Sequence, residues 1–251
     1  MARAALPGRL TWRLGRVVRL VDETPRCRSI VLEVAGWPGH LAGQHVDVRL
    51  TAEDGYQAQR SYSIASAPDD RELMLTVERL DDGEVSPYLV DELRPGDELE
   101  LRGPIGGYFV WEQARGGPLM LIAGGSGVVP LRAMLRHWAS GDRAVAARLL
   151  YSSRNLADVI YREELGRCPA DIELTLTREW PDGWQGHTGR VDRKLLEQVG
   201  WPPQARPLVY ACGPSAFVET AAQALVESGH DPNRIRTERF GPTGADGQGP
   251  R

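Results

Sequence analysis

The pattern of apolar residues changes near the middle of this 251-residue chain. Before residue 102, six short runs have the alternating or β-branched composition of half-buried antiparallel strands. Turn residues such as Asp54-Gly55 separate these runs. Six strands with one short helix predict a small closed β-barrel. The expected strands are 14–21, 29–34, 45–50, 61–64, 72–78 and 98–101.

After Gly116-Gly117-Pro118, apolar strand patterns alternate with helical ones. Strands are expected at 119–123, 145–152, 172–177, 208–211 and 234–239, and helices at 128–138, 156–165, 193–199 and 215–228. This alternation predicts a parallel sheet with right-handed crossovers and helices on both faces. The predicted fold class is therefore two-domain, with an antiparallel β-barrel at 10–115 and a Rossmann-like α/β domain at 118–241. The breaker-rich segment 242–251 is predicted to be a flexible tail.

Composition narrows the function classes. The chain is 41% hydrophobic and 25% charged, as in soluble globular proteins, and its net charge of -4 gives no general attraction to nucleic acid or anionic membrane. No run matches a signal peptide or a membrane span. Cys27, Cys168 and Cys212 lack the spacing of a zinc or iron–sulfur site, so we expect no metal and a cytoplasmic protein with reduced thiols.

The first chemical signal is Arg60-Ser61-Tyr62-Ser63 in a predicted strand. Alternation places Arg60 and Tyr62 on one face, and Ser61 and Ser63 on the other. The arginine is suited to phosphate oxygens, and the tyrosine ring can lie against a flat heterocycle. These residues favour an aromatic cofactor that carries a phosphate. An ordinary amphipathic strand with a surface arginine would have the same pattern.

A second signal is the segment around Ser86-Pro87. Ser86 is expected to be the N-cap of a short helix, with Pro87 at its first position. Free amides at that helix start form an anion site, and next to Arg60 they favour a pyrophosphate. A capped helix that merely closes one end of the barrel explains the same residues.

In the second half, Gly124-Gly125-Ser126-Gly127 follows a strand and precedes a helix. Backbone without side chains at a helix start can receive a pyrophosphate, although Pro130 replaces the last glycine of G-x-G-x-x-G. Cys212-Gly213-Pro214 ends a later strand, at the edge of the sheet where ligands bind. Cys212 is either a buried structural thiol or a wall of a nicotinamide pocket.

An R-x-Y-S strand in a barrel, followed by G-G-x-G-x-x-P and C-G-P in an α/β domain, resembles the ferredoxin–NADP reductase superfamily. The resemblance spans about residues 12–240 and is closest to short bacterial reductase components without a fused ferredoxin domain. It implies FAD and NAD(P)H as cofactors. It also implies roles for individual residues at the matching positions.

The resemblance implies that Arg60 contacts the flavin phosphate, with Ser61 beside it in the strand, that Tyr62 stacks on the isoalloxazine and that Ser63 approaches flavin N5. The turn with Gly83, Val85 and Ser86 would support a pyrophosphate, which favours FAD over FMN. The remaining implied residues are Gly124, Gly125, Ser126 and Gly127 around the dinucleotide, Cys212, Gly213 and Pro214 by the nicotinamide, and Phe240 near the flavin. Phe240 could equally just pack the last strand.

Arginines at two strand ends bear on the choice of nicotinamide cofactor. Ser153-Arg154 and Thr177-Arg178 offer hydroxyl and guanidinium groups, which a 2′-phosphate needs, whereas NAD is usually marked by an acid. Thr177-Arg178 resembles the Ser-Arg pair of NADP-specific members. Either arginine alone could be surface charge, but the two together favour NADPH. Residues 180–187 are unlike the plant enzymes, so NADH stays open.

The expected function is an NAD(P)H-dependent flavoprotein reductase that passes electrons to a separate ferredoxin, haem or molybdenum protein. Hydride transfer needs no general base, so the expected catalytic residues are Ser63 and Cys212, which would shape the transfer geometry. One alternative is a reductase that uses flavin or a small molecule as substrate. An alternative of another class is a non-catalytic flavin-binding sensor or regulatory subunit.

Overall fold

A computed structural model of the chain describes residues 10–240. These residues form two compact units. One comprises the chain up to Arg115 together with Arg132–Asp142, and the other comprises Gly116–Leu131 and the residues from Arg143 on. The predicted tail at 242–251, and Gly241 at the end of the predicted second domain, lie outside the described residues.

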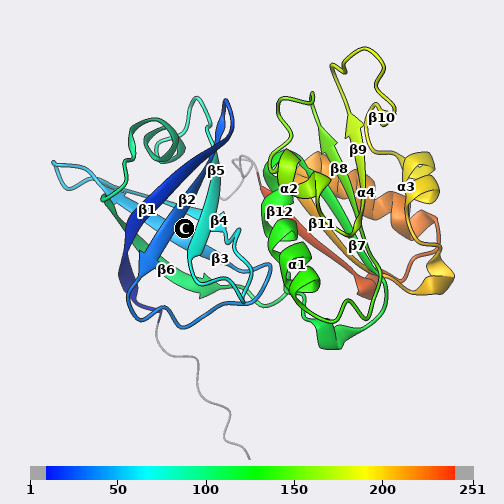
Figure 1. Cartoon of the computed structure of the whole chain (residues 1–251), viewed down its shortest axis with the longest axis horizontal. Coiled ribbons are helices and arrows are strands. Elements are labelled where there is room, and N and C mark those ends of the chain that lie inside the picture. The colour runs from blue at the N-terminus through cyan, green and yellow to red at the C-terminus, as the bar shows by residue number, and fades with distance from the viewer. Residues whose placement is uncertain (1–9, 241–251) are drawn as a thin grey trace, which may run out of the picture. The chain divides into compact units, whose positions relative to one another are not determined.

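The first unit is built on six antiparallel strands in the order β4-β3-β6-β1-β2-β5 (Figure 1). The two ends of this sheet meet where Ile64 pairs with Leu75 and the Ala65 amide donates to the Met74 carbonyl oxygen at 2.7 Å. The predicted antiparallel barrel is therefore confirmed. The strands are β1 (Trp12–Thr24), β2 (Cys27–Val34), β3 (His45–Thr51), β4 (Gln57–Ser63), β5 (Leu73–Glu78) and β6 (Glu98–Ile105).

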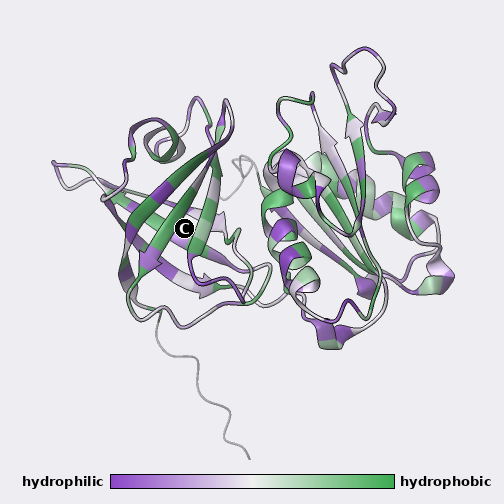
Figure 2. Ribbon diagram, viewed as in Figure 1, coloured by the Kyte–Doolittle hydropathy of each residue, from purple (hydrophilic) through white to green (hydrophobic). Residues whose placement is uncertain are grey.

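The barrel core follows from the alternation within each strand. Inward side chains of the central strands are fully buried, and Figure 2 shows hydrophobic residues along these strands. Burial of such side chains supplies the main favourable free energy of folding. The core includes Ile30, Leu32, Val46, Val48, Leu75, Val77, Leu99 and Leu101.

The short helix of the barrel differs from expectation. It is a five-residue π turn, η1 (Tyr88–Glu92), whose N-cap is Pro87 and which has no side-chain cap. The expected N-cap role of Ser86 is wrong, because its hydroxyl accepts a hydrogen bond from the Leu80 amide at 3.1 Å. Leu89 and Val90 bury the turn against the barrel core.

The second unit has six parallel strands in the order β10-β9-β8-β7-β11-β12, so the predicted Rossmann-like α/β fold is confirmed. Helices α3 and α4 share a hydrophobic core with β7 and β11. The strands are β7 (Leu119–Gly124), β8 (Ala147–Ser153), β9 (Asp171–Leu176), β10 (His187–Thr188), β11 (Leu208–Pro214) and β12 (Ile235–Phe240). The helices are α1 (Val128–Ser140), α2 (Arg162–Gly166), α3 (Arg193–Val199) and α4 (Ser215–Glu227).

Four 3-10 turns complete the described elements: η2 (Gln113–Arg115), η3 (Gly125–Gly127), η4 (Pro203–Ala205) and η5 (Pro232–Arg234). The helix expected at 156–165 exists only as α2. Its first half is not helical, because the Ile160 amide donates to the Tyr151 hydroxyl at 3.2 Å and Tyr161 adopts a left-handed φ of 59°. The two-residue strand β10 was not expected from the sequence.

The C-terminal part of α1 belongs to the first unit and holds the chain that follows β4. Buried Arg132 donates to the Ala65 carbonyl oxygen at 2.8 Å. Arg136 binds both carboxylate oxygens of Asp70, at 3.0 and 2.7 Å, and Asp70 also accepts from the Ala67 amide at 2.8 Å. These charge-assisted bonds fix the backbone directly after the Arg-Ser-Tyr-Ser strand.

No helix within residues 10–240 is both long enough and apolar enough to cross a lipid bilayer.

The Asp70 contacts predict a pH-dependent contribution to stability. Burial raises the pKa of Asp70, but the hydrogen bonds from Arg136 and the Ala67 amide outweigh it and hold the pKa below its ordinary value. Because the folded-state pKa is lowered, the stabilisation is present above the unfolded-state pKa and is lost as the pH falls through the folded-state pKa.

We therefore expect Asp70→Asn to lower the free energy of unfolding by about 1–2 kcal/mol at pH 7. In urea unfolding over a pH series, the difference from wild type should vanish in acid. The exposed Asp82 has no side-chain partner among residues 10–240, so Asp82→Asn is the matched control. A deficit that persists at low pH, or an equal loss in the control, would contradict the ion-pair account.

Candidate cofactor-binding site

Strand β4 presents two chemically different faces. On one face, the exposed Arg60 guanidinium donates to the Gln59 carbonyl oxygen and to Glu84 Oε2, both at 2.7 Å. On the other face, the Ser61 hydroxyl donates to Asp47 Oδ1 on β3 at 2.6 Å. Asp47 also pairs with Arg102 on β6 at 2.6 Å, so this second face joins three strands. The expected alternation separates the exposed Arg60 cation from a structural hydrogen-bond network.

Tyr62 lies on the Arg60 face and is half-buried against the barrel core. Burial raises the pKa of its phenol, and the opposing effect of the Arg60 charge is smaller. The phenol therefore stays neutral near pH 7, and its ring can serve as a flat apolar surface. Ser63, next along the strand, pairs with His45 in the β3–β4 register. Its hydroxyl forms no hydrogen bond with any described residue, so it can bind a ligand edge.

The turn at 83–86 lies beside Arg60 through Glu84. A Cβ at Gly83 would lie 2.7 Å from Ser86 Oγ and 3.1 Å from the Leu80 carbonyl oxygen, so a side chain there would require Ser86 to shift. Val85 and Ser86 are buried and fix the turn to the barrel. The Glu84 contact places this turn next to the Arg60 guanidinium, a group that suits phosphate oxygens.

In the second unit, the glycine loop (residues 124–127) packs tightly against the Cys-Gly-Pro segment (residues 212–214). A Cβ at Gly127 would overlap the carbonyl group of Cys212 and lie 2.7 Å from the Gly213 nitrogen. A Cβ at Gly124 would lie 2.8 Å from the ring of Phe217 in α4. These two stretches form one surface at the start of α1, which is suited to close approach of a ligand phosphate.

Cys212 is buried, and burial together with the Glu238 carboxylate raises the pKa of its thiol well above the ordinary value. Its Sγ lies 3.9 Å from Glu238 Oε2, because the two residues pair in the parallel β11–β12 register. The thiol is therefore neutral and serves as a packing surface rather than a nucleophile. Sequence reasoning missed Glu238, because its position beside Cys212 follows only from how β11 and β12 pair. It also missed Phe217, for which no motif exists.

Backbone hydrogen bonds join the ends of β8 and β9, where Arg154 and Arg178 lie. The Thr177 amide donates to the Ser153 carbonyl oxygen, and the Arg178 amide to the Arg154 carbonyl oxygen, both at 2.9 Å. The Ser153 hydroxyl donates to the Asn155 carbonyl oxygen at 3.1 Å. Within residues 10–240, neither the Arg154 nor the Arg178 guanidinium has a hydrogen bond or ion pair. Two uncompensated cations therefore lie at neighbouring strand ends.

Phe240 is the last residue of β12, opposite Pro214 in register, and its side chain is 37% exposed. The predicted residues of the second unit thus all lie at or directly after the carboxyl ends of β7, β8, β9, β11 and β12. In parallel sheets this edge is where ligands bind.

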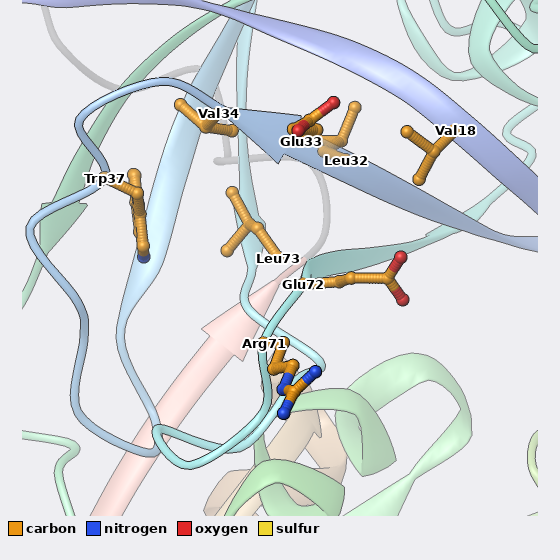
Figure 3. Close-up of a pocket in the computed structure, with 8 residues that line it drawn as sticks. All are labelled: Val18, Leu32, Glu33, Val34, Trp37, Arg71, Glu72 and Leu73. Carbon is orange, nitrogen blue, oxygen red and sulfur yellow. The ribbon is translucent and has the colours of Figure 1, made fainter.

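One cavity of about 310 Å³ lies elsewhere on the barrel, against β1, β2 and the start of β5 (Figure 3). Its lining combines apolar side chains with three charged ones, and it contains none of the predicted site residues. The lining residues are Val18, Leu32, Glu33, Val34, Trp37, Arg71, Glu72 and Leu73.

Comparisons with known proteins agree with separate binding domains in the first and second units. The model of the oxidoreductase FAD-binding domain matches residues 34–110, and that of the oxidoreductase NAD-binding domain matches residues 121–223. The FAD/NAD-binding domain of a nitric oxide dioxygenase from Vibrio cholerae has a similar structure, with a TM-score of 0.82 and 26% identity over 92% of this chain and 99% of that one.

Two relatives are similar over most of this chain. Ferredoxin–NADP reductase B of Sorangium cellulosum is 33% identical over 90% of this chain and 96% of its own length. The glycine betaine monooxygenase reductase subunit of Chromohalobacter salexigens is 32% identical over 94% of this chain and 67% of its own length. The chain thus spans about two thirds of the latter relative.

The contact at Gly127 predicts the effect of adding a single methyl group. Gly127→Ala should weaken NAD(P)H binding by at least about tenfold, because the loop must shift away from Cys212. Isothermal titration of the nicotinamide cofactor measures this change. Gly166→Ala is the control, since a Cβ there meets no atom within 4 Å. Unchanged binding in Gly127→Ala would show that the glycine loop does not contact the cofactor.

Burial predicts the order in which the three free cysteines react. Cys168 is partly exposed, whereas Cys27 and Cys212 are buried, and burial raises the pKa of all three thiols. In the native protein, N-ethylmaleimide should modify Cys168 alone, with all three thiols reacting in denaturant. Peptide mass spectrometry identifies the sites. Rapid native labelling of Cys212 would contradict its burial beside Glu238.

Proposed function

The chain belongs to the ferredoxin–NADP reductase superfamily, and on that premise we propose that it passes electrons from NAD(P)H through bound FAD to a separate redox protein. It is a flavoprotein oxidoreductase with an FAD-binding and an NAD-binding domain, which we assign to residues 10–115 and 118–241. The observation that carries the proposal is the close packing of the glycine loop against the Cys-Gly-Pro segment at the ligand edge of the sheet.

The residues of the first unit fit the phosphate-bearing FAD. Arg60 and the amides of the turn at 83–86 would hold its phosphates, and the neutral ring of Tyr62 would support the isoalloxazine. Ser61 contributes backbone only, since its hydroxyl is bonded to Asp47. The free hydroxyl of Ser63 would hydrogen-bond the reactive ring edge. When bound, the flavin supplies the hydride-accepting and electron-releasing chemistry.

The residues of the second unit fit a nicotinamide dinucleotide. The glycine loop, with Gly125 and Ser126 at its centre, would receive the pyrophosphate. Cys212, Gly213 and Pro214 would line the nicotinamide pocket and exclude water. The buried Cys212 thiol would give this pocket an uncharged surface. Phe240 would lie near the flavin. Orientation of the two rings is the chain's contribution to rate, and no general base is required.

We further propose NADPH as the preferred donor. Arg154 and Arg178 have no partner among the described residues, and a 2′-phosphate dianion would neutralise both. The hydroxyls of Ser153 and Thr177 are bonded to backbone carbonyl oxygens, so they would act by fixing the strand ends.

The proposed acceptor is a protein with a one-electron centre, such as a ferredoxin, a haem protein or a molybdenum protein. The names of the two relatives support this class, since one is a ferredoxin reductase and the other the reductase subunit of a monooxygenase. A cytoplasmic location is also proposed, in keeping with the three free thiols.

Anaerobic titration of the purified protein tests the function. The protein should carry a visible flavin band that less than one equivalent of NADPH partly bleaches, with NADH much less effective. A protein without retained flavin that nevertheless oxidises NADPH in the presence of excess free flavin would instead support a flavin-as-substrate reductase. A flavoprotein that neither cofactor reduces would support a flavin-binding sensor.

The donor preference has its own test. Arg154→Ala and Arg178→Ala should each raise the KM for NADPH by about tenfold, since each removes one charge-assisted contact to phosphate. The KM for NADH should stay unchanged. Arg167→Ala is the control, because Arg167 precedes β9 and lies at the opposite edge of the sheet. Equal losses with NADPH and NADH would contradict a 2′-phosphate site at these arginines.

A further inference from the structure

Arg60, the residue proposed to bind the flavin phosphate, already forms an ion pair with Glu84. Arg60 Nη2 donates to Glu84 Oε2 at 2.7 Å, and the Tyr56 hydroxyl donates to Glu84 Oε1 at 2.7 Å. The Arg60 and Glu84 side chains are 53% and 49% exposed, and Tyr56 is 57% exposed. Glu84 lies inside the turn at 83–86, between Gly83 and the buried Val85. The carboxylate is therefore anchored at the place proposed for phosphate.

Both oxygens of this carboxylate are engaged. The hydrogen bonds from Tyr56 and Arg60 hold the pKa of Glu84 below its ordinary value, so the group is ionised near pH 7. Arg60 uses its other terminal nitrogen on the Gln59 carbonyl oxygen at 2.7 Å. A phosphate oxygen that approaches Arg60 thus meets a full negative charge beside the cation.

We propose that Glu84 competes with the flavin phosphate for Arg60 and thereby sets how tightly the chain holds FAD. This inference rests on the proposed flavin site at Arg60. A phosphate either displaces the carboxylate, at the cost of its ion pair with Arg60, or lies beside it, where the two like charges repel. The effect acts on the phosphate alone, so a flavin without phosphate does not experience it.

Exposure of the pair makes the exchange reversible. Ion pairs between solvent-exposed groups are weak, so a phosphate can replace the carboxylate without a large penalty. Without flavin, Glu84 neutralises Arg60 and Tyr56 holds it in place. Glu84 thus takes the place of the phosphate on Arg60, and the phosphate of FAD replaces it when the flavin binds.

The test is flavin binding to the full-length chain stripped of flavin, followed by flavin fluorescence. Glu84→Gln removes the charge and keeps the shape of the side chain. We expect its Kd to fall by up to about fivefold for FAD and for FMN, the effect of one nearby charge in water. The Kd for riboflavin, which has no phosphate, should not change. Glu53→Gln makes the same charge change at an exposed residue without a partner among residues 10–240, and should match wild type.

Tyr56→Phe provides a second variant that keeps every charge. It frees one carboxylate oxygen, so the Kd for FAD should fall by about twofold, in the same direction as in Glu84→Gln. Weaker FAD binding in Glu84→Gln would overturn the inference, because Glu84 would then be positioning Arg60. Equal tightening for riboflavin would also overturn it, by placing the effect at the ring. If the wild-type chain binds none of the three flavins, the proposed flavin site itself fails and this inference with it.

Discussion

The ligand edge of the second unit depends on a contact between two stretches of backbone. The start of α1 can lie directly against the end of β11 only because Gly127 has no side chain, and a Cβ there would occupy the carbonyl group of Cys212. Gly124 and Gly213 both give room to the ring of Phe217 in the same way. Tight packing of this kind leaves backbone amides, rather than side chains, facing a ligand, which is how a helix start binds phosphate. The buried, uncharged thiol of Cys212 is a consequence of the same packing.

In the barrel, the two faces of strand β4 have different roles. In β4, Ser61 is tied to Asp47 and through it to Arg102, which fixes the strand within the sheet. Arg60, which is paired with Glu84, and the half-buried Tyr62 lie on the opposite face, where we propose that the flavin binds. Directly after the strand, the closing pair of Ile64 with Leu75 and the bond from Arg132 to Ala65 hold its end. The arginine that we propose to bind phosphate thus lies on a strand whose face and end are held by hydrogen bonds, which favours a preorganised site.

The fold class could be predicted from the sequence because its signals are local. Alternation in β2 and β3, and the strand–loop–helix order from β7 to α1, are visible in short windows. The helix expected at 156–165 was wrong for its first half because a distant partner, the Tyr151 hydroxyl, binds the Ile160 amide. The cap expected at Ser86 failed for a similar reason, since Leu80 takes its hydroxyl. In both cases, a hydrogen bond between a backbone amide and a side chain six or nine residues away overrides local preference.

Prediction of the site followed the same rule. Motif residues such as Arg60, Gly127 and Cys212 were found because their spacing along the chain is characteristic. Glu84, Glu238 and Phe217 were missed because each reaches the site through a tertiary contact. Glu84 pairs with Arg60, and Glu238 lies opposite Cys212 in the β11–β12 register. Phe217 contacts the site from the first turn of α4. These three residues surround the motifs and determine charge and space there. Sequence motifs therefore indicated the groups that we propose to contact the cofactors, whereas the structure was needed to find what surrounds those groups.

A crystal structure of the protein grown with FAD tests the central claim most directly, namely that the Arg60 face of β4 binds the flavin. The account predicts an isoalloxazine ring against Tyr62 and a phosphate within hydrogen-bond distance of Arg60 and of the amides at 83–86. Flavin density at another place, such as the cavity beside Trp37 and Arg71, with Arg60 still paired only to Glu84, would contradict it.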